Sequence, residues 1–377
     1  MTDKQTVKFG DICKEVKLTT KAPIGDGYER YIGLEHLDSG SLKIKRWGMI
    51  ADDSPSFTRV FKKGQLLFGK RRPYLKKAAI AEFDGVCSGD IIVLDSQVKS
   101  ELELLEVIVQ LDSFWEWAVR TSSGSLSPRT KFSAIKEYKV PFSLCDLKKI
   151  VELIKPIRLA LTKSEQFSFA TNSLRKAYIE RAFWSCYENR DYVPLKSLCK
   201  KITDGTHQKV ERDPNGDVPF LYVSCIGKGV VLWSNTDRIS EKTYSEISKG
   251  REIDEEVILY SAVGSYGNAV YIGREVKAAY QRHIAYIKVD SSKVNPKFIE
   301  IWLNSRFGKF HSDRLAIGNA QKTVTLGDLS RFPVPKLSID EQNKIVNSYC
   351  QIENVANEIT SSIANIQLLK KTVLERK

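Results

Sequence analysis

The sequence predicts an α/β fold of the α+β type, built from two similar domains, because the chain of 377 residues is an internal duplication. Residues 7–13 and 193–199 begin two copies that then pass through the same motifs in the same order. Each copy closes on a helical pattern whose landmarks lie 195 residues apart, as Ile150 and Ile345 do. A period this long is far above the roughly 20 to 50 residues of solenoid repeats and indicates a duplicated domain.

Each copy begins with short β-rich runs separated by turn residues. The runs are residues 31–32, 66–68, 78–81 and 91–94 in the first copy and 220–223, 257–260, 269–272 and 284–289 in the second. A helical pattern follows at residues 102–119 and 296–315, and Asn295 and Pro296 predict the start of the latter. Strands followed by a helix favour a mixed or antiparallel sheet in each domain.

A long helix is predicted after each domain, behind Pro141 and Pro335. Residues 143–146 and 338–341 both resemble capping boxes and also lie 195 residues apart. The sequence therefore divides into a first domain at 1–142, a central helix at 143–190, a second domain at 191–337 and a C-terminal helix at 338–377.

The two helices are expected to pack on each other. The C-terminal helix repeats an apolar residue every seven positions, at Ile345, Ile352, Ile359, Ile366 and Val373. The stripe of the central helix changes phase, and Pro156 predicts a kink there. An antiparallel coiled coil would bury both stripes and give the chain a pseudo-two-fold axis. The alternative, that each helix folds back on its own domain, stays open.

The composition favours a polyanionic partner. The chain has 59 Lys and Arg against 46 Asp and Glu, a net charge of +13. The alternative is a soluble protein that is merely basic. Seven cysteines without a C-x-x-C pair argue against a disulfide framework and a zinc site. We expect a reduced, cytoplasmic protein without membrane contact, since no run of about 18 apolar residues occurs.

No catalytic motif is complete. Residues 64–70 match most of the phosphate-loop pattern, but Arg71 stands where that loop needs Ser or Thr. The chain has no Pro-Pro, which excludes the Pro-Pro loop with which methyltransferases hold a flipped base. The four histidines lie far apart. The sequence therefore predicts neither an enzymatic site nor a cofactor bound by this chain.

The first candidate contact region for nucleic acid is a basic run. Residues 54–81 contain no acidic side chain, and seven Lys and Arg lie between positions 62 and 77. Lys and Arg side chains at this density commonly bind the phosphates of nucleic acid, and an arginine can also pair with guanine O6 and N7. The alternative is a solvated charged face. The predicted contacts here are Lys70, Arg71, Arg72, Tyr74, Lys76 and Lys77.

The second copy carries different side chains at the matching places. Its predicted contacts are Ser261, Ser265, Tyr266, Gln281, Arg282 and His283. The polar loops at residues 122–131 and 318–322 form another matched pair, with Ser123, Ser125, Arg129 and Lys131 in one and Asn319, Gln321 and Lys322 in the other. Thr206, His207 and Lys209 are a weaker candidate. Different chemistry on one scaffold is typical of two readers of different sequences.

Residues 64–77, 83–88 and 335–346 carry a resemblance, over the whole length, to the specificity subunits of Type I restriction-modification systems. The resemblance implies two target recognition domains that each read half of a split DNA site. It also implies that the paired helices set the gap and bind two methyltransferase subunits. Residues 145–147 depart from the helix opening that residues 340–342 show.

The predicted function is therefore sequence-specific binding of double-stranded DNA by a subunit without catalysis of its own. The resemblance assigns S-adenosylmethionine to the methyltransferase partners, and ATP and magnesium to restriction subunits where these are present. Two alternatives stay open, a self-contained DNA-modifying enzyme and a helical scaffold or RNA-binding protein.

Overall fold

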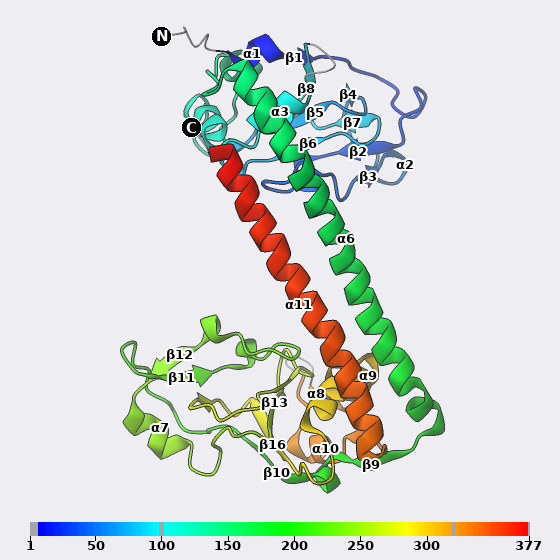
Figure 1. Cartoon of the computed structure of the whole chain (residues 1–377), viewed down its shortest axis with the longest axis vertical. Coiled ribbons are helices and arrows are strands. Elements are labelled where there is room, and N and C mark those ends of the chain that lie inside the picture. The colour runs from blue at the N-terminus through cyan, green and yellow to red at the C-terminus, as the bar shows by residue number, and fades with distance from the viewer. Residues whose placement is uncertain (1–6, 98–101, 319–321, 376–377) are drawn as a thin grey trace. The chain divides into compact units, whose positions relative to one another are not determined.

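The computed structural model describes residues 7–97, 102–318 and 322–375, which fall into two compact units (Figure 1). The first unit is Met1–Glu165 with Ser361–Lys377, and the second is Gln166–Thr360. The long helices α6 (Leu144–Asn189) and α11 (Ile339–Glu375) each contribute to both units. Because the units divide these helices, the four-part division made from the sequence stays a prediction.

The first unit holds two small sheets. One is antiparallel, with strand order β1-β8-β5-β6. The other has the order β3-β2-β7-β4, in which β2 and β7 are parallel. The strands are β1 (Cys13–Val16), β2 (Arg30–Ile32), β3 (Gly48–Met49), β4 (Arg59–Phe61), β5 (Leu66–Gly69), β6 (Ala78–Ile80), β7 (Gly85–Cys87) and β8 (Ile91–Ser96). The helices are α1 (Phe9–Ile12), η1 (Leu34–His36), α2 (Ile50–Asp53), η2 (Pro73–Leu75), α3 (Leu102–Ile108), α4 (Asp112–Arg120) and α5 (Phe132–Ile135).

The second unit repeats this plan. Its antiparallel sheet has the order β10-β16-β13-β14, and its mixed sheet has the order β12-β11-β15. A third pair joins β17 to β9. The strands are β9 (Tyr192–Pro194), β10 (Cys199–Asp204), β11 (Val218–Leu221), β12 (Asp237–Ile239), β13 (Val257–Ser261), β14 (Ala269–Tyr271), β15 (Ala279–Tyr280), β16 (Ile284–Val289) and β17 (Pro333–Pro335). The helices are η4 (Leu195–Leu198), η5 (Val223–Cys225), η6 (Trp233–Asn235), α7 (Glu241–Ile247), α8 (Pro296–Asn304), α9 (Arg306–Leu315) and α10 (Leu326–Ser330).

The antiparallel sheets of the two units have the same strand order, which confirms the predicted duplication and the predicted α+β class. In the first unit β1, β8, β5 and β6 occupy the places that β10, β16, β13 and β14 occupy in the second. The parallel pair β2–β7 corresponds in the same way to β11–β15. All eight sequence runs predicted as strands contribute to strands.

In both units the antiparallel sheet is covered by helices. All four residues of β5 are buried, and Phe68 stacks on Trp115 of α4 with ring centroids 5.0 Å apart. In the second unit Trp302 of α8 is fully buried and meets Phe183 of α6 at 4.9 Å. Burial of large apolar side chains on one sheet face supplies most of the stability of such a layer.

The long helices pack on each other within each unit, as well as on the neighbouring sheet. In the first unit Ile154 of α6 shares one core with Leu374 of α11. In the second unit Phe183 shares a core with Ile345, and the Arg175 guanidinium lies 4.0 Å from the Glu353 carboxylate. Residues later in α6 contact residues earlier in α11, so the two helices run antiparallel. A pseudo-two-fold relation of the whole chain stays a prediction.

The predicted helix starts are confirmed. The Asn295 side chain accepts from the Lys297 amide at 2.9 Å, with Pro296 at the first helical position. Ser338 Oγ accepts from the Glu341 amide, and the Glu341 carboxylate accepts from the Ser338 amide at 2.8 Å, which is a reciprocal capping box. Ser143 Oγ accepts from the Asp146 amide at 3.1 Å and donates to the Asp146 carboxylate at 2.7 Å.

Two helix predictions were wrong in their extent. Residues 102–119 form α3 and α4 rather than one helix, and residues 296–315 form α8 and α9. The break between α8 and α9 falls at Ser305, whose extended backbone leaves the helix and whose hydroxyl caps the Gly308 amide at 3.0 Å. A serine that caps a new helix outweighs the continuing apolar period. Helix α6 continues through Pro156.

Candidate nucleic-acid interface

The basic run follows the end of β5 and forms a tight, exposed turn. The short helix η2 lies between Arg72 and Lys76, whose φ angles of 52° and 49° are both left-handed. Residues other than glycine rarely adopt this backbone conformation. Where they do, the strained residues tend to lie at binding or active sites. Tyr74, between them, is 52% exposed. The turn packs against α4, which fixes its direction.

The structure brings the two contact regions predicted for the first domain together. Arg129 pairs in a β-bridge both with Ser123, within its own loop, and with Arg71 of the basic run. The Arg72 amide donates to the Pro128 carbonyl at 2.7 Å. Two segments about 55 residues apart in sequence therefore form one surface, which we call the basic face and define as residues 70–77 with residues 122–131.

Asp90 lies between the arginines of this face. Arg129 Nε donates to Asp90 Oδ1 at 2.8 Å, and Arg71 Nη1 approaches Oδ2 at 3.4 Å. The hydrogen bond from Arg129 lowers the pKa of Asp90, and the charges of both arginines add to this effect. Ser127 Oγ accepts from Arg71 Nη2 at 3.2 Å and from Arg72 Nε at 3.3 Å. Asp90 and Ser127 were not predicted, although both fix the arginine side chains.

Other cations of the run are already engaged. Lys76 Nζ lies 2.6 Å from Asp112, and Lys77 Nζ donates to the Leu34 carbonyl at 2.6 Å. The remaining predicted residues lie at the surface or half-buried beside it: Lys70, Ser123, Ser125 and Lys131. Leu126, at the tip of the second loop, is 90% exposed. The basic face thus combines exposed polar side chains with cations held by acids or by a backbone carbonyl.

The second unit builds the same backbone frame. The Gly264 amide donates to the Lys322 carbonyl at 3.0 Å, as Arg72 does to Pro128. Thr323 bridges both Ile317 and Val263, as Arg129 bridges Ser123 and Arg71. The Ala262 amide donates to the His283 carbonyl at 3.0 Å, as Lys70 does to Asp90 at 2.9 Å. Val263, His283 and Thr323 therefore stand where the first unit has Arg71, Asp90 and Arg129.

The side chains on this second frame are mostly neutral. We define the polar face as residues 261–266, 281–283 and 322–323, with residues 206–209 beside them. The Arg282 amide donates to the Thr206 carbonyl at 3.1 Å, which joins the weaker candidate loop to this face. Burial, followed by the charges of Arg282 and His207, lowers the pKa of His283, so the neutral imidazole is favoured.

Two of the predicted contacts are buried and support the loops instead. Ser261 is fully buried, and its Oγ accepts from the Asn268 amide at 2.9 Å. Thr206 is 8% exposed, and its Oγ1 accepts from the Gln208 amide at 3.1 Å. The exposed predicted residues are Ser265, His207, Lys209, Arg282 and Lys322, whereas Tyr266 and Gln281 are half-buried. Asn319 and Gln321 lie outside the described residues.

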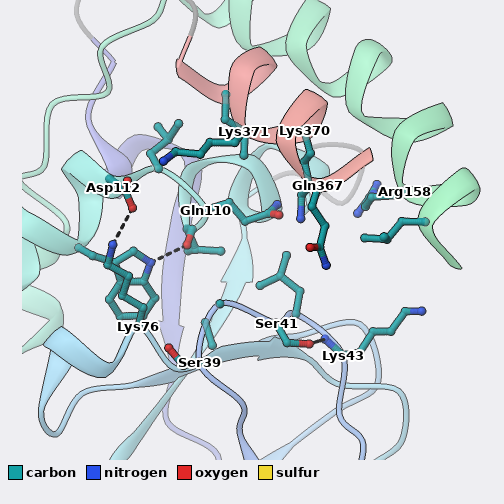
Figure 2. Close-up of a pocket in the computed structure, with 18 of the residues that line it drawn as sticks. Ser39, Ser41, Lys43, Lys76, Gln110, Asp112, Arg158, Gln367, Lys370 and Lys371 are labelled. Carbon is teal, nitrogen blue, oxygen red and sulfur yellow. Dashed lines mark hydrogen bonds and ion pairs between the residues drawn. The ribbon is translucent and has the colours of Figure 1, made fainter. Parts of the chain in front are cut away.

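A cavity of about 980 Å³ adjoins the basic face at Lys76 (Figure 2). It lies in the first unit, where residues 158–165 of α6 and the C-terminal end of α11 meet residues 39–45 and the start of α4. Its cations except Lys370 pair with acids: Lys43 with Glu165, Lys45 with Asp38, Lys76 with Asp112, Arg158 with Glu106, and Lys371 with Glu375. Burial and the charge of Arg158 lower the pKa of Lys370, for which the described residues supply no hydrogen bond or ion pair.

Within residues 7–97, 102–318 and 322–375 no group of three or more His, Cys, Asp or Glu side chains could hold a metal ion. None of the helices in these ranges is both long and apolar enough to cross a membrane.

The basic face and the polar face share one backbone frame and differ in their side chains. Comparison with known proteins indicates the family that this chain resembles. Residues 187–368 match the sequence model of the Type I restriction modification DNA specificity domain. The resemblance to specificity subunits is thereby confirmed.

Two curated relatives come from Escherichia coli. The Type I restriction enzyme EcoDI specificity subunit is 26% identical over 132 residues, and the EcoBI specificity subunit is 23% identical over 168 residues. The matches cover 35% and 44% of this chain, but only 29% and 35% of the relatives.

Two solved structures share the fold along almost the whole chain. The crystal structure of a Type-I restriction-modification system S subunit from M. genitalium has a TM-score of 0.61 at 15% identity and covers 98% of this chain and 95% of its own. A structure from a study of complex assembly and conformational transition of the Type I system has a TM-score of 0.57 at 16% identity, with 98% and 96% covered.

Proposed function

We propose that this chain is the DNA-specificity subunit of a Type I restriction-modification enzyme and reads a bipartite site, one half with each unit. The observation that carries the proposal is the repeated frame with different side chains. Arg71, Asp90 and Arg129 occupy it in the first unit, whereas Val263, His283 and Thr323 occupy it in the second. Two copies of one backbone with different hydrogen-bonding groups suit two different base sequences.

We further propose that the chain performs no chemistry and acts in the cytoplasm as a scaffold. Two methyltransferase subunits would supply S-adenosylmethionine and the catalytic loop, and restriction subunits would supply ATP-dependent cleavage with magnesium. Several large apolar side chains exposed on the single helix α6 support a protein partner, because contiguous exposed apolar surface marks interaction sites. These side chains are Leu153, Phe167, Phe169, Leu174 and Trp184, which are 51% to 76% exposed.

The proposal is tested by co-expressing the chain with the methyltransferase of its own system and mapping the methylated bases in genomic DNA. We expect two short conserved blocks separated by a gap of unspecified sequence, roughly one helical turn from centre to centre. One continuous block would overturn the bipartite reading. Methyl transfer by the purified chain without a partner would overturn the non-catalytic role.

A pair of variants separates the half-sites. Arg71→Gln with Arg72→Gln should weaken recognition of one block and leave the other unchanged. Arg282→Gln, on the polar face, is the matched control and should affect only the other block. Equal loss at both blocks from either variant would make these arginines contacts to the DNA backbone, without a role in reading sequence.

A further inference from the structure

On the basic face, Arg129 differs from its neighbours in the way its guanidinium is held. Its Nε donates to Asp90 Oδ1 at 2.8 Å and its Nη2 lies 3.4 Å from Oδ2, so the carboxylate holds the guanidinium from the side. The end of the fork keeps donors free, since the one other hydrogen bond that the described residues offer it is a long one of 3.5 Å from Nη1 to the Ser127 carbonyl. The Arg129 side chain is 47% exposed.

Arg71 is held in the opposite way. Its Nη1 and Nη2, the end of the fork, face Asp90 and Ser127, and its Nε is buried. Arg71 therefore has few donors left for a ligand. Its Nη1 instead contacts Oδ2 of Asp90, whose Oδ1 accepts from Arg129. Asp90, bound by two arginines, cannot rotate away from Arg129 without losing both contacts.

We infer that Arg129, oriented by Asp90, reads a guanine in the major groove of the first half-site. Guanine is the base that presents two acceptors, O6 and N7, side by side, and a guanidinium fork with two parallel donors matches them. Adenine presents a donor next to its N7, and the pyrimidines lack the second acceptor. The inference rests on the proposed function, because it assigns a base to a face proposed to read DNA.

The carboxylate also argues against a phosphate at this position. Arg71, Asp90 and Arg129 together carry one net positive charge, and Asp90 would repel a phosphate brought close to the fork. A neutral base edge has no such penalty. Lys131 lies two residues further on, is exposed, and has no acid partner among the described residues, so it is the better phosphate contact.

The requirement is confined to one half-site. On the matching frame of the second unit Thr323 stands in place of Arg129, and His283 in place of Asp90. A threonine hydroxyl offers one donor and cannot form the paired contact. We therefore expect one strongly required G·C pair in the half-site read by the first unit, without a counterpart at the matching position of the other.

The experiment uses the full chain bound to its methyltransferase subunits and a randomised duplex pool from which bound sequences are selected. Wild type should enrich a bipartite site with one nearly invariant G·C pair. Arg129→Lys keeps the charge but lacks the fork, and we expect preference for that pair to fall roughly 10- to 100-fold with the other half-site unchanged. Thr323→Ala is the matched control and should alter only the other half-site.

Asp90 is tested as a positioning residue. Asp90→Asn should relax preference at the same single base pair, leave the rest of the site and the thermal unfolding midpoint unchanged, and be partly rescued by Asp90→Glu. Lys131→Gln should weaken binding to all sequences alike. If wild type enriches a bipartite site but Arg129→Lys leaves every base preference intact, the inference is wrong. If wild type enriches no sequence at all, the proposed function itself fails.

Discussion

A buried acid in the second unit gives a sharp test of how the domain is held to its helix. Glu300 of α8 has a side chain that is 2% exposed and accepts from the Tyr271 amide at 3.2 Å. Its one cationic partner among the described residues is Lys297, at 3.1 Å, and Lys297 also lies 3.6 Å from Glu353 of α11. Lys297→Met removes that partner. We expect the free energy of unfolding of this unit to fall by about 3 to 5 kcal/mol at pH 8, the usual effect of leaving a buried charge unpaired.

The same variant should be sensitive to pH. Burial raises the pKa of Glu300 to about 6 in spite of the attraction of Lys297, whereas the ordinary value is 4.5. The folded state therefore disfavours the ionised carboxylate by about 2 kcal/mol above pH 6, and this penalty is relieved as the pH falls toward 4.5. Without Lys297 the pKa rises further, so the loss of stability should be smaller at pH 5.5 than at pH 8.

Urea unfolding of the full chain at both pH values measures the change, and hydrogen exchange of the peptides from α8 and β14 assigns it to this site. Glu300→Gln added to Lys297→Met should recover most of the loss, since the amide oxygen still accepts from Tyr271 and no ionised group is left there. Lys293→Met, in the exposed turn before α8, should leave the midpoint unchanged. The reasoning is refuted if Lys297→Met costs less than about 1 kcal/mol at pH 8 or if the double variant is no more stable than the single one.

Three further outcomes follow from local geometry. Asn295→Ala removes the cap of α8 and should cost about 1 kcal/mol in urea unfolding, whereas Asn295→Asp should cost less; equal losses would contradict the capping role. Lys370→Met should raise the melting temperature at pH 7, because burial and a neighbouring cation lower the pKa of Lys370 and destabilise its ammonium in the folded state. That gain should shrink as the pH rises through the lowered pKa toward 10.5, and a variant less stable than wild type at pH 7 would count against it. In iodoacetamide labelling followed by mass spectrometry, exposed Cys145 should react in the native protein and Cys13, whose pKa burial raises to about 12, only after unfolding; similar labelling rates would show that burial does not protect Cys13.

The candidate site could be predicted from the sequence only in part. The basic run and the loop at residues 122–131 stand out because charge and loop composition are local properties. Asp90 and Ser127 carry no such signal, since one acid behind a basic run and one serine in a polar loop are ordinary in composition. Their role arises when β5 and β8 pair and bring Arg71 and Arg129 to the same carboxylate.

Burial decided which predicted contacts are available. Ser261 and Thr206 have the right chemistry for base edges, but their side chains face inward and hold their own loops. A Ser or Thr hydroxyl can hydrogen-bond either its own loop or a ligand, and the sequence does not distinguish the two. Only the neighbours of the hydroxyl in the folded chain decide between them.

By itself the sequence determined the duplication, the α+β class, the eight strand runs and the starts of α8 and α11. These features depend on repeats, apolar period and caps that act within a few residues. The tertiary structure alone decided the mixed sheets with their parallel pairs, the division of the predicted helices into α3 and α4 and into α8 and α9, and the matching of Arg71, Asp90 and Arg129 with Val263, His283 and Thr323. Strands of two or three residues have too little period to identify their partners, and side chains far apart in sequence meet only after the sheets have formed.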